Sequence, residues 1–260
     1  MLTFFGIDVL LAQEPEFKAP VAKKIPNRLI IHGDTVTDNY FWLRDKNAPE
    51  VINHLYAENA YADNVMKQSS FLQKVLYEEF KSRRKESFTS RPSKHKGFLY
   101  YSRYEKGKDY PVLCRKKDTV HATETVILNI NKLAEEQPYI NVSGYNISPD
   151  QQWLYYGIDS KGNHVLTYYL KHITKDSVYV SEKLDNVMSM IWAEDNKTIY
   201  YTKPEDKTLR QYRVYRHVIG RAAAEDELVF EENDKTFQID MHRSSSRQYI
   251  FFYLRKNQMP

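Results

Sequence analysis

The sequence predicts a mainly β protein, a partial β-propeller of about three to four blades preceded by an α-helical amino-terminal arm. Three observations carry this prediction: a tyrosine-rich strand motif that returns four times, short strands between its copies, and a helical pattern confined to the first third of the chain. The composition agrees, because 21 tyrosines and 12 phenylalanines among 260 residues favour strands.

The strand motif defines the repeat. Its copies start at Phe98, Trp153, Thr198 and Tyr249, with spacings of 55, 45 and 51 residues. Three of them follow a polar turn, at residues 148–150, 193–195 and 244–246. Second strands are expected at 110–115, 165–170 and 212–216, and third strands at 125–128, 177–180 and 228–230.

A period of roughly 40–50 residues built from short antiparallel strands is typical of propeller blades. An all-β sandwich is the alternative, but a sandwich does not need the same motif to return in register four times. We expect the tyrosines to fill the faces between adjacent blades. The incomplete propeller is expected over residues 91–260.

The stretch from Asp45 to Glu86 predicts helix. Asn47 is the expected capping residue, followed by Pro49 and Glu50 in the first turn, where helices favour a proline and an acid. Apolar residues then recur at spacings of three and four, which indicates an amphipathic helix, and the basic run 81–85 marks its end. Residues 87–96 are expected to form a linker, so the arm is expected over residues 19–90.

Residues 1–18 form a leader with two open interpretations. Residues 1–13 are mostly apolar, and the small residue Ala12 closes the apolar run, which resembles a signal-peptide remnant. Asp8 interrupts the run, however, and no basic residue precedes it. The alternative is a frayed leader or a strand packed on the body. The first interpretation implies a periplasmic or secreted protein, and the second a cytoplasmic one.

The sequence names no catalytic, cofactor-binding or metal-binding residue. No two glycines lie four residues apart, so the Gly-x-Ser-x-Gly turn of α/β-hydrolases cannot be written. The eight histidines show no ligand spacing, and no cofactor loop is present. Cys114 lies within an apolar strand, where a buried, inert thiol is expected.

Charge and hydropathy limit the partners. The net charge of +4 comes from 38 basic and 34 acidic residues mixed along the chain, so we expect no nucleic-acid partner. No apolar stretch reaches the ~18 residues of a transmembrane helix, so we expect no membrane partner.

Several segments are similar to the prolyl oligopeptidase family of serine peptidases. Residues 19–26, 31–34, 38–45 and 56–61 resemble the amino-terminal segment of that family. Residues 100–117 and 208–217 resemble the oligopeptidase B branch in particular. The resemblance extends from about residue 19 to about residue 252.

The resemblance implies an enzyme with an arm, a seven-bladed propeller that admits oligopeptide substrates, and an α/β-hydrolase domain that cleaves after Lys or Arg. The chain stops in the expected fourth blade, so we expect a truncated peptidase without its catalytic triad and inactive alone. The alternative is a non-catalytic propeller that binds a peptide or a protein. Exposed blade edges predict self-association.

Overall fold

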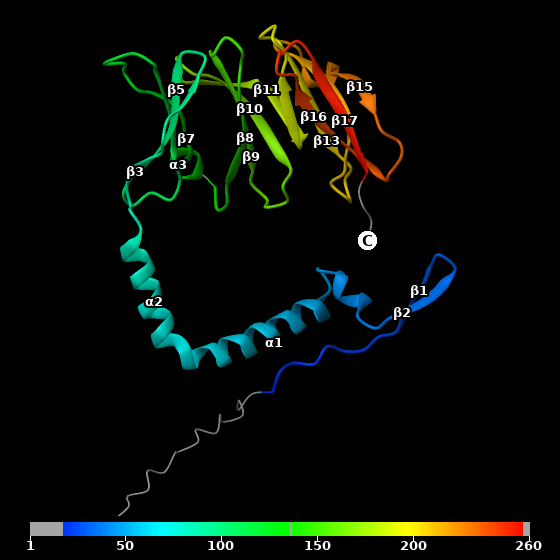
Figure 1. Ribbon diagram of the computed structural model, residues 1–260. Coiled ribbons are helices and arrows are strands. Elements are labelled where there is room, and N and C mark those ends of the chain that lie inside the picture. Colours follow the sequence, from blue (N-terminus) through cyan, green and yellow to red (C-terminus); the bar gives the residue numbers. More distant parts are fainter. Residues whose placement is uncertain (1–17, 136, 257–260) are drawn as a thin grey trace, which may run out of the picture. The chain divides into compact units, whose positions relative to one another are not determined.

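The computed structural model describes residues 18–135 and 137–256. The chain divides into two compact units, one ending at Arg84 and the other beginning at Lys85 (Figure 1). The interpretation of residues 1–13 as a signal-peptide remnant concerns a segment outside the described residues. Among the described helices, none is long and apolar enough to cross a membrane.

The first unit contains a hairpin and two helices. The sequence analysis missed the hairpin, in which β1 (Asn27–Ile31) pairs antiparallel with β2 (Asp34–Asp38). The helices confirm the expectation for residues 45–86. They are the short η1 (Phe41–Arg44), α1 (Pro49–Met66), the short η2 (Lys67–Ser69) and α2 (Ser70–Arg83).

The start of α1 is predicted correctly, but its cap is not. Pro49 is the first helical residue, where its fixed φ suits the helix and its missing N–H needs no partner. The N-cap is Ala48, and no side chain caps the helix, so the role expected for Asn47 is wrong. At the other end, Lys81 and Arg83 lie in the last turn of α2, as the charge pattern predicted.

The apolar stripe of the two helices is largely exposed within this unit. Val51 is the buried residue of α1, and α2 has none. Phe71 and Phe80 of α2 are 81% and 67% exposed. The spacing of apolar residues therefore predicts the helices correctly, although most of their apolar side chains are not covered within this unit.

The second unit is a series of antiparallel sheets that follow one another along the chain (Figure 1). In the first sheet β3 (Phe88–Thr89) and β4 (Ser93–His95) pair with β5 (Phe98–Tyr104), followed by β6 (Val112–Lys117) and β7 (Thr125–Asn129), with α3 (Ile130–Ala134) after it. The second is β8 (Asn141–Ile147), β9 (Trp153–Asp159), β10 (Leu166–His172) and β11 (Ser177–Val187). The third is β12 (Ser189–Trp192), β13 (Thr198–Pro204), β14 (Gln211–Val218) and, after η3 (Ala223–Glu225), β15 (Glu227–Glu231). The fourth is β16 (Phe237–Arg243) with β17 (Ile250–Lys256).

The repeated motif takes the same place in each sheet, as predicted. Its copies form the strands β5, β9, β13 and β17, and each of these is the second strand in the order of its sheet. Three of the motif's first residues also begin their strand, and Tyr249 precedes its strand by one residue. The second and third strands that the sequence predicted are also present, as β6, β10 and β14 and as β7, β11 and β15.

Two expectations need correction. Residues 87–96 are not a plain linker, because they contain β3 and β4, which pair with β5. The sequence analysis also did not locate the first strand of each later sheet, namely β8, β12 and β16. These strands lie just before the polar turns and lack the tyrosine motif, so the repeat alone did not reveal them.

The cores lie between neighbouring sheets, as in a propeller. Period-two alternation along β9 sends Tyr155 to the core shared with the third sheet and Leu154 and Tyr156 to the core shared with the first. The first of these cores also holds Tyr168 and Tyr201. Tyrosines therefore do fill the faces between blades, as predicted.

The first strands of neighbouring sheets lie close to one another. The indole Nε1 of Trp192 in β12 donates to the backbone carbonyl of Asn146 in β8 at 3.1 Å. Because β8, β12 and β16 each lead into the polar turn before the motif strand, these turns gather at the same end of the sheets (Figure 1). We call this end the turn face.

Candidate functional site

The turns of the turn face share one backbone geometry. In each, the amide of the first turn residue donates to the carbonyl of the first motif residue, which closes a short loop. These bonds join Ser148 to Trp153 at 2.9 Å, Ala193 to Thr198 at 2.8 Å and Ser244 to Tyr249 at 2.9 Å. The three predicted turns are thus equivalent parts of successive blades.

The fourth residue of each turn has a left-handed backbone. Gln151, Asn196 and Arg247 have φ values of 66°, 61° and 63°. In the first sheet the shorter turn Lys96-Gly97 also has positive φ at both residues, 44° and 78°. Asn and Gly suit this conformation, whereas Lys and Arg pay a backbone cost there.

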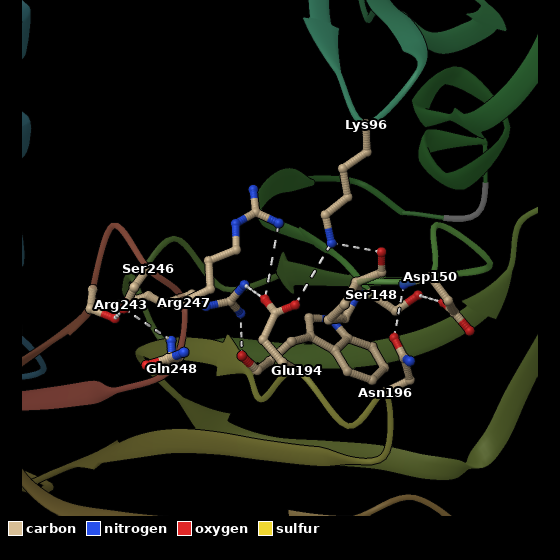
Figure 2. A network of polar contacts seen from close by, with 12 residues as sticks. Lys96, Ser148, Asp150, Glu194, Asn196, Arg243, Ser246, Arg247 and Gln248 are labelled. Atoms are coloured by element: carbon tan, nitrogen blue, oxygen red, sulfur yellow. Dashed lines mark hydrogen bonds and ion pairs between the residues drawn. The ribbon is translucent and has the colours of Figure 1, made fainter.

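Glu194 of the third turn lies where three blades meet. Its carboxylate accepts a hydrogen bond from Arg243 Nη1 at 2.8 Å, with Lys96 Nζ at 3.8 Å and Arg247 Nη1 at 4.0 Å. Figure 2 shows all three cationic side chains pointing toward this carboxylate. One negative charge therefore faces three positive charges from the first and fourth sheets.

Further bonds join the turns to one another. Lys96 Nζ donates to the carbonyl of Pro149 at 2.8 Å, and the amide of Asp150 donates to Asn196 Oδ1 at 2.8 Å (Figure 2). Arg243 also donates to the carbonyl of Trp192. The turn face is therefore a continuous polar network across four sheets.

An open depression of about 530 Å³ lies in the turn face. Its charged lining side chains are basic, Lys96, Arg243 and Arg247, and Glu194 stands outside the lining. His95 also lines it; partial desolvation of the ring and the positive charges of Arg247 and Lys96 lower the pKa of His95. The depression therefore carries an excess of positive charge.

A buried histidine elsewhere in the propeller is structural. This residue is His217, and it is fully buried. Its Nδ1 lies 2.7 Å from Asp226 Oδ1, and its Nε2 lies 3.2 Å from Glu182 Oε2. Because carboxylates occupy both ring nitrogens, neither is free to take a proton from a nucleophile. Glu182 comes from β11 and His217 from β14, so the cluster ties the second sheet to the third.

The single cysteine of the chain lies inside the first sheet. Cys114 is buried in β6, and desolvation raises the pKa of its thiol to about 11. In residues 18–135 and 137–256 no group of three or more His, Cys, Asp or Glu side chains is arranged to hold a metal ion.

The residues of the depression were missed by the sequence analysis, which named no site residue. They come from the turns of the first, second and fourth sheets and from the ends of the strands β4, β8, β12 and β16, and no local motif joins them. The one available signal was the alignment of the turns by the repeat, which places Gln151, Asn196 and Arg247 at the same position.

Residues 20–258 match the family model described as "Prolyl oligopeptidase, N-terminal beta-propeller domain". The chain is 35% identical over 244 residues to Protease 2 of Moraxella lacunata, which covers 91% of this chain and 35% of that protein. It is 33% identical over 250 residues to dipeptidyl aminopeptidase BI of Pseudoxanthomonas mexicana, which covers 90% of this chain and 34% of that protein. The chain thus spans about one third of the length of these relatives.

The fold is similar to that of solved oligopeptidases. Oligopeptidase B from Leishmania major superimposes with a TM-score of 0.82 at 28% identity, over 92% of this chain and 36% of the other. Oligopeptidase B from Trypanosoma brucei, solved with covalently bound antipain, gives a TM-score of 0.78 at 26% identity, over 90% of this chain and 35% of the other.

Proposed function

We propose that this chain, which belongs to the prolyl oligopeptidase family, supplies the amino-terminal arm and first blades of a serine oligopeptidase that cleaves short peptides after Lys or Arg. The match of the family's propeller domain to residues 20–258 is the observation that carries this proposal. The similarity to Protease 2 and to two oligopeptidases B supports the branch within the family.

The propeller's role in this proposal is to select substrates by size. Blades packed face to face around an axis leave a narrow passage, which short peptides enter and folded proteins do not. The Ser, Asp and His of the triad lie, in this proposal, outside these 260 residues, because the Gly-x-Ser-x-Gly turn cannot be written within them.

A second candidate activity is the release of dipeptides from the amino end of a peptide. The observation that favours it is the similarity to dipeptidyl aminopeptidase BI, whose 33% identity is close to the 35% of Protease 2. Both candidates are peptide hydrolysis, and they differ in whether a free amino terminus near the cleaved bond is required.

The test is to read the locus beyond codon 260 and to express its whole product. We expect further blades and a Gly-x-Ser-x-Gly turn, and a product that hydrolyses an amino-blocked peptide after arginine. Replacement of that serine by alanine is the control for contaminating proteases. Cleavage of unblocked peptides alone, two residues at a time, would favour the dipeptidyl activity.

The 260-residue chain is assayed beside that product, and we expect no turnover from it. A stop codon followed by unrelated sequence in several independent isolates would contradict the proposal. It would favour a non-catalytic propeller that binds a peptide or a protein.

A further inference from the structure

We propose that the depression in the turn face binds a carboxylate group of an oligopeptide, through Arg247 and Lys96. A carboxylate fits because the charged side chains that line the depression are hydrogen-bond donors. Only the choice of a peptide as bearer of the carboxylate rests on the proposed function. The preference for a carboxylate rests on the charges and contacts described above.

The charge distribution is the first argument. Lys96, Arg243 and Arg247 line the depression, whereas the acid that faces them, Glu194, does not. Glu194, which lines a neighbouring depression together with Arg247, balances one of these three positive charges, so two remain in excess around this space.

The second argument is how loosely two of the cations are held. Arg243 is fixed by Glu194 and by the carbonyl of Trp192. The contact of Arg247 with Glu194 is 4.0 Å, beyond hydrogen-bond distance, and its side chain is 35% exposed. The planar guanidinium of Arg247 thus has donors available for a bidentate bond with a carboxylate.

The ammonium of Lys96 donates one hydrogen bond, to Pro149, at 2.8 Å and lies 3.8 Å from Glu194. An ammonium carries three donors, so Lys96 has others to offer a second carboxylate oxygen. The serine hydroxyls of the fourth turn, Ser244 and Ser245, line the same depression. Together these groups place donors from the first and the fourth sheet around one space.

The third argument is the backbone cost of placing these cations. Arg247 occupies the left-handed position that Gln151 and Asn196 hold in the second and third blades, and Lys96 occupies a left-handed position of the shorter first turn. Asparagine is the favoured residue at such positions, and Lys96 directly precedes a glycine, where Asn-Gly is the preferred turn. Basic side chains at such strained positions are consistent with a role for their charge.

The test uses substitutions that improve the turns while removing the charge. We expect Arg247→Asn to leave the thermal midpoint of unfolding unchanged or higher, because asparagine suits a left-handed backbone. Lys96→Asn gains the same backbone benefit but loses the hydrogen bond to Pro149, so we expect its midpoint to fall slightly. We expect each to weaken carboxylate binding by about tenfold or more, since a charge-assisted hydrogen bond is lost. Arg216→Gln, which removes an exposed arginine of β14 outside the depression, is the matched control.

Binding is measured on the full chain by equilibrium dialysis of radiolabelled, amino-acetylated tetrapeptides of Ala, Gly and Ser. One peptide ends in a free carboxylate, one in an amide, and one in an amide with an internal glutamate. Tighter binding of the first indicates that the terminal carboxylate is bound, and tighter binding of the third that a side-chain carboxylate is bound. Both results support the site.

Equal binding of the uncharged amide peptide would overturn the proposal, as would full binding by the folded Arg247→Asn variant. A fall in the thermal midpoint of Arg247→Asn would show that Arg247 serves the fold. No cleavage is measured, so this result is independent of the outcome at the locus.

Discussion

At the scale of single residues, burial decides which groups can react. Cys114 is the only cysteine of the chain, and its Sγ lies within β6, 3.6 Å from the carbonyl of Val112. Desolvation is the largest cause of its raised pKa, followed by the negative charge of Glu124. The thiol is therefore held in its neutral, unreactive form.

We predict that Cys114 reacts with a thiol reagent at pH 8 about 100-fold more slowly in the folded chain than in the unfolded one. The ordinary value of 9.0 and the raised pKa of about 11 differ by enough to reduce the thiolate by that factor. The rate of colour release from a disulfide reagent, with and without urea, measures it. Equal rates in the two states would contradict the prediction.

The same shift sets the sign of a pH effect on stability. Below pH 9 the thiol is neutral in both the folded and the unfolded chain, and its contribution to the free energy of unfolding is fully present. As the pH rises from 9 toward 11 the unfolded chain ionises its thiol first, so this contribution to the free energy of unfolding is lost.

The depression shows why single residues of the site could not be predicted from the sequence. Lys96, Glu194 and Arg247 are each ordinary charged residues in a polar turn, where the default expectation is a solvated side chain. They become a site because successive blades bring their turns together. That information lies in the packing of sheets and not in any local pattern.

At the scale of elements, the strands that carried a tyrosine motif were predictable and the strands before them were not. Successive apolar residues of β9 and β13 enter two different cores in alternation, which leaves a strong signal. β8 carries Gly144 and several polar residues, and none of its residues is fully buried. A weakly patterned strand gives a weak signal.

Glycine in β8 has a definite structural reason. Gly144 has a φ of 64° at a register shift between β8 and β9, and a Cβ there would collide with the ring of Tyr168 in β10. Gly107 has a similar φ of 72° but open space around it. A comparison of substitutions at the two glycines therefore distinguishes the cost of backbone strain, which both share, from the cost of steric overlap, which only Gly144 has.

We predict that Gly144→Ala lowers the free energy of unfolding by about 3 kcal/mol, and Gly107→Ala by about 1 kcal/mol. Both substitutions strain a left-handed backbone, and only the first also displaces a buried tyrosine. Urea denaturation at low protein concentration measures both. Equal losses for the two variants would show that the space around Gly144 can adjust.

At the scale of the whole molecule, the apolar surface of each unit is considerable. Phe71 and Phe80 of α2 and Tyr249 next to β17 are more than 60% exposed. Within the described residues β17 pairs on one edge only, with β16. Exposed apolar patches and unpaired edges favour association between copies of a chain.

We predict that the purified 260-residue chain is oligomeric, poorly soluble or bound by chaperones. Sedimentation velocity measures the first, and a clean monomer with a cooperative thermal transition would contradict the prediction. The double variant Phe71→Ser with Phe80→Ser should sediment as smaller species if α2 contributes to the contact. The same two changes should leave the propeller's thermal transition in place, because neither side chain belongs to its cores.

The turns before β9, β13 and β17 share one backbone geometry but differ in their side chains. The turn is closed by bonds between backbone groups, and glutamine, asparagine and arginine all occupy its fourth position. Gln151 and Asn196 use their side chains to bond a neighbouring blade, through Tyr100 and Asp150. The guanidinium of Arg247 lies beyond hydrogen-bond distance of Glu194, so the fourth blade is the one whose side chain at this position can be exchanged with the least loss of contacts between blades.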